Sequence, residues 1–400
     1  MSGAGQPSGM GEEDHVASTD SGDSFAATTG KRLLIAGGGT GGHLFPAMAV
    51  ADAWKAATGG EVLFVGTPWG LESRLLPREG RRLATLRVGQ LKGRGVWRRL
   101  RTLAGLLPSL WGARQILQEF RPHVVLGVGG YASAPAVVAA WLAGCPAVLH
   151  EQNAMPGLAN RLLGRLVQTI CLSFPQASAL FPGRRVLFTG NPVRASLVEA
   201  ASVGGGLSSG GPLRVLVFGG SQGAQILTEV VPSALAQLPQ QEGVAQVQVW
   251  HQVRAEDAAA VESIYHRAGI SAVCAPFFHD MAQAYQSADL IIARAGATTL
   301  AELTIMGRPA LLIPYPYAAD DHQTANARAL VEAGGAWMQP QAQFTVAWLT
   351  EFLRQRLADR EEMAGVGQRA RSLAHPDAAQ KIVATLLDLA RTSFSCKGGE

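Results

Sequence analysis

The fold is decided by Ile35-Ala36-Gly37-Gly38-Gly39-Thr40-Gly41-Gly42-His43-Leu44-Phe45-Pro46. Residues 31–36 are predicted to form a short buried strand, and residues 44–57 carry an apolar stripe at helical spacing. A strand, a glycine-rich turn and a helix amino terminus together make an anion site, because unpaired amides and the helix dipole point at the turn. Gly37, Gly39 and Gly42 also have the Gly-x-Gly-x-x-Gly spacing of dinucleotide-binding folds, which alone is equally typical of tight packing. His43 is the unusual residue, because few structural needs place a titratable ring at the mouth of a helix.

Length and composition favour an α/β protein of two or three domains. The chain has 400 residues, of which 48% are hydrophobic and 16% charged, so it can bury sizeable cores. The net charge of +4 is too small to indicate nucleic acid by itself. The four cysteines have no metal or redox spacing, which favours a reduced, cytosolic compartment. No secretory signal is expected, and the longest apolar run, residues 134–149, is interrupted by proline and glycine and is shorter than the ~20 residues of a membrane span. We therefore expect a soluble or peripheral protein.

Short Val-, Leu- and Ile-rich segments alternate with helical patterns, which is typical of parallel strands buried on both faces. The expected strands are residues 31–36, 61–65, 83–87, 123–126, 147–149 and 167–171, and then 213–218, 247–250, 272–275, 290–293 and 310–314. This predicts two Rossmann-like domains, residues 31–195 and 212–376, facing across a cleft that is the natural ligand site. A Gly/Ser-rich linker is expected at 196–211, a disordered extension at 1–30, and an amphipathic helix at 377–391 that packs back on the first domain.

Two strand–turn–helix segments of the second domain carry candidate ligand residues. Ser221 lies in the turn 219–223, where its hydroxyl can cap the helix, bind phosphate or do both. In the segment 293–302, the amides of Ala297 and Thr298 begin a helix. Glu302 follows about one turn later, where its carboxylate could accept two hydroxyls of a ribose. The alternative for Glu302 is an acid that complements the helix dipole.

Further polar clusters follow predicted strands, a position that favours function. In the first domain these are residues 150–153, which begin with His150, and residues 190–194, which end with Arg194. The alternative for His150 is a hydrogen-bonded core residue, and Arg194 can reach a ligand phosphate or only a hinge carboxylate. In the second domain residues 320–327 suit recognition of sugar hydroxyls. The adjacent Asp320 and Asp321 are weak evidence for a metal pair, and Asp321 better fits a helix cap.

A basic stretch lies in the first domain. Residues 78–101 contain nine Arg or Lys against one acid, and they lead into a segment with apolar residues at helical spacing. These are Trp97, Leu100, Leu103, Leu107, Leu110 and Trp111. The combination is typical of an interfacial membrane site. The alternative is a solvated basic loop before a core helix broken at Pro108. Nucleic acid is a poorer fit, because no second basic patch accompanies this one.

Seven motifs together resemble the MurG family, the bacterial peptidoglycan N-acetylglucosaminyltransferases. They are Gly-Gly-Thr-Gly-Gly-His (38–43), Gly-Gly-Tyr (129–131), His-Glu-Gln-Asn (150–153), Gly-Asn-Pro-Val-Arg (190–194), Gly-Gly-Ser-Gln-Gly-Ala (219–224), Arg-x-Gly-Ala-x-Thr-x-x-Glu (294–302) and Asp-Asp-His-Gln-x-x-Asn-Ala (320–327). The resemblance covers about residues 31–390. It implies a GT-B glycosyltransferase that moves N-acetylglucosamine from UDP-N-acetylglucosamine to the C4 hydroxyl of the muramyl sugar of lipid I, the undecaprenyl-pyrophosphoryl-muramyl-pentapeptide. The products would be lipid II and UDP. It also implies a peripheral enzyme on the cytoplasmic face of the inner membrane, which would give the basic and apolar stretch an anionic membrane surface to bind.

The resemblance assigns roles to matching residues. Thr40, Gly41 and Gly42 would line the cleft near the donor sugar and face the acceptor pyrophosphate. Asn153 and Arg194 would contact the donor from the first domain, and Ser221 would hold its diphosphate. Phe278 would present backbone to uracil. Ala297, Thr298, Thr299, Leu300, Ala301 and Glu302 would hold phosphate at the helix start and ribose at Glu302. Gln323, with His322 beside it, would read sugar hydroxyls.

The chemistry of this transfer needs a base, because an acceptor hydroxyl is a poor nucleophile near neutral pH. His43 is the predicted base of a single displacement that inverts the anomeric carbon, and UDP leaves if its growing charge meets fixed amides and hydroxyls. No Asp-x-Asp motif is present, so we expect no cofactor and no obligate protein-bound metal. Three alternatives remain at this point. They are a UDP-N-acetylglucosamine 2-epimerase of the same architecture, a non-catalytic nucleotide-sugar or membrane adaptor, and a nicotinamide dehydrogenase, which lacks an acid at the required strand end.

Overall fold

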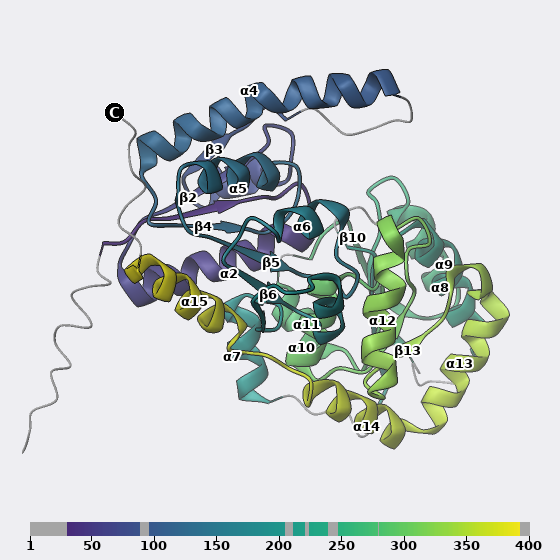
Figure 1. Cartoon of the computed structure of the whole chain (residues 1–400). Coiled ribbons are helices and arrows are strands. Elements are labelled where there is room, and N and C mark those ends of the chain that lie inside the picture. The colour runs from purple at the N-terminus through teal and green to yellow at the C-terminus, as the bar shows by residue number, and fades with distance from the viewer. Residues whose placement is uncertain are drawn as a thin grey trace, which may run out of the picture.

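The structure, a computed structural model, describes residues 30–88, 96–204, 211–220, 224–238, 247–278 and 280–392. Two parallel sheets organise these residues into two bodies (Figure 1). The predicted architecture of two Rossmann-like α/β domains is therefore confirmed.

The first sheet has seven strands in the order β3-β2-β1-β4-β5-β6-β7. In chain order they are β1 (Leu33–Ala36), β2 (Val62–Gly66), β3 (Leu83–Thr85), β4 (Val124–Gly127), β5 (Ala147–Glu151), β6 (Thr169–Leu172) and β7 (Val186–Phe188). The helices between them are α2 (Gly41–Thr58), α3 (Glu72–Arg78), α4 (Val96–Phe120), α5 (Ser133–Leu142) and α6 (Leu158–Leu163), with a 3-10 turn, η1 (Pro175–Leu180).

The second sheet has six strands in the order β10-β9-β8-β11-β12-β13. They are β8 (Leu213–Phe218), β9 (Val247–Gln252), β10 (Ser271–Ala275), β11 (Leu290–Ala293), β12 (Ala310–Leu312) and β13 (Trp337–Met338). Its helices are α8 (Gln225–Ala236), α9 (Ala258–Arg267), α10 (Met281–Ser287), α11 (Ala297–Met306), α12 (His322–Glu332), α13 (Val346–Ala358) and α14 (Arg360–Arg371), with 3-10 turns η2 (Ala319–Asp321) and η3 (Gln341–Gln343).

In each sheet the order in which the strands are added reverses at one point. This point lies between β1 and β4 in the first sheet and between β8 and β11 in the second. In open α/β sheets ligands bind beyond the carboxyl ends of the strands at this switch point. The segments that leave these strands are the ones singled out in the sequence: residues 37–43 after β1, 128–132 after β4, 219–220 after β8 and 294–296 after β11. The topology therefore brings the glycine-rich turns of each domain together.

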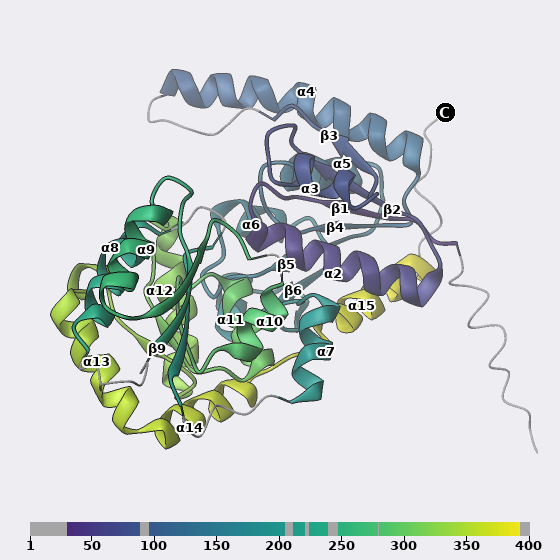
Figure 2. The same cartoon turned by 180° about the vertical axis from the view of Figure 1, so that it is seen from behind.

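Two buried clusters lie on each sheet. In the first domain, one face packs α4 and α5 through residues such as Leu117 and Val137. The other face packs α2 and the carboxyl-terminal helix α15 (Ala378–Thr392), where Ile382 and Leu386 join the cluster that contains Trp54. Figures 1 and 2 both show α15 beside α2, although α15 follows every element of the second domain in the chain. The end of the chain thus completes the core of its first domain.

Three elements differ from the sequence-based expectation. The strands β7 and β13 were not predicted, because three and two residues are too short to show a pattern. Residues 196–203, expected to begin the linker 196–211, lie instead in the helix α7 (Ala195–Val203). Its Ala- and Ser-rich composition hides a buried face: Leu197 and Ala201 pack into the second domain's core with α10 and α11. The expected extension at 1–30 lies outside the described residues except for Gly30.

Candidate active site

The first glycine turn is built on a buried carboxylate. Gly37 and Gly39 have φ of 143° and 89°, a region that favours glycine. A Cβ on Gly37 would also lie 2.2 Å from the carbonyl oxygen of Gly129, so the turns after β1 and β4 touch. Glu72, only 1% exposed, accepts the amide of Gly39 at 2.6 Å and the amide of Thr67 at 2.8 Å. Its carboxylate therefore fixes the turn that leads into α2.

His43 lies in the first turn of α2 and is half-buried. Its Nδ1 lies 3.1 Å from Oε1 of Gln152, at the end of β5. Burial lowers the pKa of His43, and hydrogen bonds to Gln152 and to the Val128 backbone partly oppose that shift. A neutral imidazole at neutral pH can accept a proton, which is the state a general base needs. His150 is fully buried, and burial lowers its pKa to about 3, so it is a neutral hydrogen-bonded residue.

The first turns of α2 and α11 are in contact across the two domains. The hydroxyl of Thr298 donates to the carbonyl oxygen of Gly42 at 3.0 Å. Gly296 is the N-cap of α11 and supplies no side-chain cap, so the first amides of this helix, at Ala297 and Thr298, have no capping side chain. Two positive helix ends near one place favour an anion there. The structure thus brings predicted residues 40–42 and 297–298 together.

Glu302 lies at the centre of a polar cluster that joins the domains. It is 7% exposed, and its Oε2 accepts the hydroxyl of Tyr285 at 2.9 Å. Arg194, at the crossing between the domains, approaches Oε1 at 3.5 Å and stacks over the ring of Phe45 at 4.9 Å. Burial raises the pKa of Glu302, and the Arg194 charge opposes that change. Arg194 therefore contacts a carboxylate of one domain and an aromatic ring of the other, which corresponds to the hinge-carboxylate alternative; its contact with a ligand phosphate stays a prediction.

A pair of asparagines also joins the domains. Asn326 on α12 is fully buried; its side-chain nitrogen donates to Oδ1 of Asn153 and to the carbonyl of Ala295, both at 3.2 Å. Its Oδ1 accepts the amide of Ala154 at 2.8 Å. Asn153, predicted to contact the donor, thus reaches the second domain through Asn326. The sequence had placed Asn326 in a polar cluster but gave it no role of its own.

The remaining predicted residues are placed as follows. Gln323 begins α12, and its Oε1 accepts the amide of Tyr315 at 2.9 Å. Phe278 is half-buried and packs on the core beside α10. Ser221 lies outside the described residues. Asp321 occupies the N-cap position of α12, but its carboxylate accepts the hydroxyl of Thr324 rather than a backbone amide. Within the described ranges, no group of three His, Cys, Asp or Glu residues could hold a metal.

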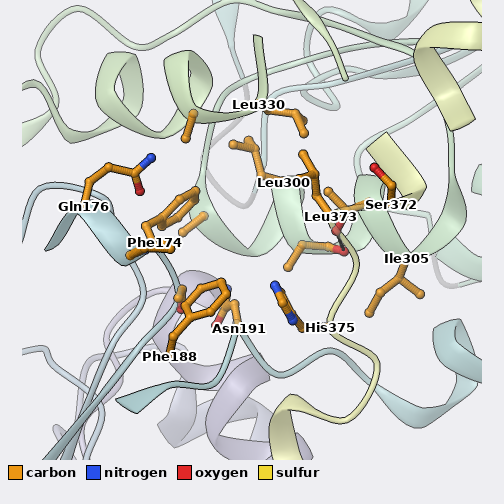
Figure 3. A pocket seen from close by; sticks show the side chains of 16 residues that line it. Phe174, Gln176, Phe188, Asn191, Leu300, Ile305, Leu330, Ser372, Leu373 and His375 are labelled. Atoms are coloured by element: carbon orange, nitrogen blue, oxygen red, sulfur yellow. Dashed lines mark hydrogen bonds between the residues drawn. The ribbon is translucent and has the colours of Figure 1, made fainter. Parts of the chain in front are cut away.

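A cavity of about 380 Å³ lies between the domains and is lined by residues along one side of α11. Figure 3 shows Phe174 and Phe188 of the first domain facing Leu300 and Leu330 of the second, with His375 from the returning chain. Leu300 and Ala301, expected to bind substrate, line this mainly apolar cavity, whereas Thr298 contacts Gly42. The helix α11 therefore presents one side to the cavity and another to the polar cluster around Glu302.

Family models match most of the chain. Residues 33–172 match the glycosyltransferase family 28 N-terminal domain, and residues 214–382 match the glycosyltransferase family 28 C-terminal domain. Among curated proteins, the UDP-N-acetylglucosamine–N-acetylmuramyl-(pentapeptide) pyrophosphoryl-undecaprenol N-acetylglucosamine transferase of Magnetococcus marinus is 53% identical over 366 residues, covering 91% of this chain and 98% of that protein. The protein of the same name from Geobacter sp. (strain M21) is 44% identical over 363 residues, covering 89% and 95%.

Solved structures agree with these matches. MurG of Acinetobacter baumannii superposes with a TM-score of 0.74 at 32% identity, covering 90% of this chain and 99% of that one. A UDP-GlcNAc 2-epimerase from Neisseria meningitidis superposes with a TM-score of 0.62 at 12% identity, covering 90% and 100%. At such low identity the second likeness concerns the fold alone.

Proposed function

The chain belongs to glycosyltransferase family 28, and from this premise we propose how its two domains carry out sugar transfer. It is an N-acetylglucosaminyltransferase that moves N-acetylglucosamine from UDP-N-acetylglucosamine to the muramyl sugar of lipid I, giving lipid II and UDP. The structural observation that best supports a transferase is the contact between Thr298 and Gly42. This contact supports a site between the domains to which α2 would contribute a base and α11 its first amides.

The proposed chemistry is a single displacement. His43 takes the proton of the acceptor C4 hydroxyl while its oxygen attacks the anomeric carbon, and the bond to UDP breaks. The electron pair of that bond stays on the leaving diphosphate, whose charge the amides of Ala297 and Thr298 and the hydroxyl of Ser221 stabilise. The displacement inverts the anomeric configuration. Its supports are the position of His43 beside α11 and the lowered pKa that keeps the ring neutral.

The proposed donor site has two sides. The second domain contributes Phe278 for the uracil, Glu302 for the ribose and Gln323 for the sugar. Thr299, Leu300 and Ala301 continue the helix between these contacts. From the first domain, Thr40, Gly41 and Gly42 face the sugar and the acceptor pyrophosphate, while Asn153 and Arg194 reach across the cleft. Their existing interdomain contacts support this assignment, since a ligand between them would exchange bonds that already join the two domains.

We also propose that the first domain binds an anionic membrane surface on the cytoplasmic side of the inner membrane. Leu107 and Trp111 on α4 are 70% and 65% exposed, and Trp141 and Leu142 on the neighbouring α5 are 52% and 61% exposed. Figures 1 and 2 show α4 on the outer side of the first domain, away from the second. Exposed tryptophans and leucines beside basic residues are typical of interfacial binding.

The basic stretch contributes less free charge than its composition indicates. Arg81 pairs with Asp52 at 2.7 Å and Arg82 pairs with Glu61 at 2.8 Å. Lys92 and Arg94 lie outside the described residues. No helix among the described residues has the length and apolar composition that a bilayer-spanning helix needs. The proposal therefore depends on the exposed apolar side chains as much as on charge.

Sugar transfer is tested with radiolabelled UDP-N-acetylglucosamine and a lipid I analogue, for the wild type and His43→Ala. We expect labelled lipid II from the wild type and loss of turnover, with donor binding retained, in the variant. Donor binding without transfer by the wild type would support the adaptor, and conversion of UDP-N-acetylglucosamine without acceptor would support the epimerase. An undiminished rate in His43→Ala would remove His43 as base.

Membrane binding is tested by sedimentation with vesicles that contain anionic lipid. The double variant Leu107→Glu/Trp111→Glu should lose binding while keeping transfer to a water-soluble acceptor analogue. Val203→Glu is the control, because Val203 is 82% exposed at the end of α7, a helix whose Leu197 and Ala201 pack into the second domain's core. Equal binding by all three proteins would contradict the proposal.

A further inference from the structure

A chain of hydrogen bonds fixes which way the amide of Gln152 points. Its nitrogen donates to the carbonyl oxygen of Val128 at 2.9 Å and lies 3.2 Å from Nδ1 of His150. A carbonyl oxygen can only accept, so the NH₂ group must face Val128 and Oε1 must face the other way, toward His43. On the far side, Nε2 of His150 lies 3.2 Å from the hydroxyl of Ser173. Gln152 is 2% exposed, so water does not compete for these positions.

This orientation decides the tautomer of His43. An amide oxygen has no proton to give, so the bond between Oε1 of Gln152 and Nδ1 of His43 exists only with the proton on Nδ1. In a neutral imidazole the other nitrogen, Nε2, then carries the lone pair. A base that held its proton on Nε2 instead would have its lone pair facing Gln152 and not the substrate.

We propose that Gln152 is a positioning residue that holds His43 in the Nδ1–H tautomer, so that Nε2 is the atom that takes the acceptor proton. Val128, His150 and Ser173 hold Gln152 in turn. This inference rests on the proposed role of His43 as base, but the tautomer itself is a property of the protein without substrate. It also explains why the partner of His43 is an amide: a neutral acceptor orients the ring without adding the charge that would favour its protonation.

The charged and titratable groups around His43 are Glu72, below the glycine turn, His150, next to Gln152, and His322, from the second domain. Glu72 raises the pKa of His43 and His322 lowers it, and neither exchanges a hydrogen bond with the ring. The other hydrogen-bond partner of the ring is the Val128 backbone, whose carbonyl also accepts. The tautomer is assigned to the 3.1 Å bond between Nδ1 and Gln152 and not to these charges.

The first test measures the tautomer directly by ¹⁵N NMR of protein labelled at histidine. The His43 signals are assigned by their absence from the spectrum of His43→Ala. Above the pKa of His43, the wild type should show Nδ1 protonated and Nε2 unprotonated. Gln152→Met, which keeps the side-chain length but removes the acceptor, should show a mixture or the opposite tautomer. The control is Gln168→Met, which removes one hydrogen bond to the Ala147 amide elsewhere on the same sheet. Protonation of Nε2 in the wild type, or no change in Gln152→Met, would overturn the proposal.

The second test separates positioning from folding. Gln152→Glu retains an oxygen that accepts from Nδ1, so it should keep the wild-type tautomer and more activity than Gln152→Met. For Gln152→Met we expect kcat to fall at least about tenfold, with KM for the donor within about twofold, because only the proton transfer is affected. A Gln152→Met enzyme with wild-type kcat would contradict the proposal. If His43→Ala retains turnover, the base is another residue, and the NMR result still stands or falls on its own.

Discussion

At the scale of residues, the candidate site consists of side chains held by partners far away in sequence. Glu72 reaches Gly39 and Gln152 reaches His43, across 33 and 109 positions. The sequence singled out His43 and Glu302 as candidates, because each lies near the start of a helix that follows a strand and a turn. It could not identify Glu72, Tyr285 or the role of Gln152, because a carboxyl, a phenol or an amide has meaning only beside the group that it contacts. Local sequence thus indicates where chemistry occurs, and the fold determines which side chains support it.

Replacing Tyr285 by Phe should weaken donor binding. The change removes the hydroxyl that donates to Glu302 at 2.9 Å and leaves a buried carboxylate with one partner fewer. Loss of a hydrogen bond to a charged group costs about 1.5–3 kcal/mol when the group stays buried. We expect KM for UDP-N-acetylglucosamine to rise about tenfold with a smaller change in kcat, measured by steady-state transfer. Tyr265→Phe is the control, since it removes a buried hydroxyl bonded to His251 and not to the site. Equal KM values for the two variants would show that Tyr285 does not support Glu302.

The pH dependence of transfer should follow the lowered pKa of His43. Burial disfavours the imidazolium, so the ring loses its proton below the ordinary value of 6.5. Below that lowered pKa the protonated ring cannot act as base, and the rate falls. We therefore expect kcat to stay level from pH 8 to below about pH 6.5 and to decline only in more acidic buffer. Circular dichroism at each pH controls for unfolding. A decline that begins above pH 7 would assign the profile to another group.

At the scale of elements, the two sheets were predictable and their edges were not. Buried strands such as Leu33–Ala36 and Leu213–Phe218 are continuous apolar runs bounded by glycine, which few other structures produce. The edge strand β13 has two residues, and its pairing with β12 is visible only in three dimensions. The helix α7 has the composition of a linker, and its buried face can be recognised only from its packing against α10 and α11. The sequence pattern therefore predicts elements that have several core residues of their own. It fails for short elements whose burial depends on the neighbouring elements.

The glycine turn after β1 should tolerate substitution poorly, for a reason beyond backbone conformation. Gly37 and Gly59 both have positive φ, but a Cβ on Gly59 would meet nothing within 4 Å, whereas on Gly37 it would meet the Gly129 carbonyl. Gly59→Ala should cost about 1–2 kcal/mol of unfolding free energy, the cost of left-handed backbone. Gly37→Ala should cost clearly more and reduce transfer. Urea unfolding of the two variants gives the comparison, and equal midpoints would show that the contact with Gly129 relaxes freely.

At the scale of the whole molecule, the chain leaves its first domain near residue 194 and returns to it through residues 372–377. The ring of His375 packs on Gly190, where a Cβ would lie 2.3 Å from His375, so the two crossings touch. Beyond them α15 closes the core around Trp54. Asn191, beside the first crossing, and Ser372, Leu373 and His375, in the second, line the cavity of Figure 3. The second domain is therefore inserted between parts of the first, and neither can be cut away at a single point.

Removing one buried contact of α15 should therefore destabilise the first domain, whose Trp54 lies 332 residues before Leu386 in the chain. Leu386 is fully buried against that core. Leu386→Ala should lower the unfolding free energy by about 2–5 kcal/mol, as for other buried leucines. Gln380→Ala is the control, because Gln380 is exposed on the same helix. Thermal unfolding with and without UDP gives the measurement. Similar transitions for both variants would mean that α15 is not part of that cooperative unit.

The meeting of α2 and α11 also bears on turnover. Two helix amino termini in contact are like poles, and they repel as long as nothing negative lies between them. The hydrogen bond from Thr298 to the Gly42 carbonyl offsets part of this repulsion, and we expect a bound diphosphate to cancel the rest and its departure to restore it. We expect product release and separation of the two domains to be coupled, and we expect added salt, which screens the repulsion between the helix ends, to slow the separation of an empty cleft.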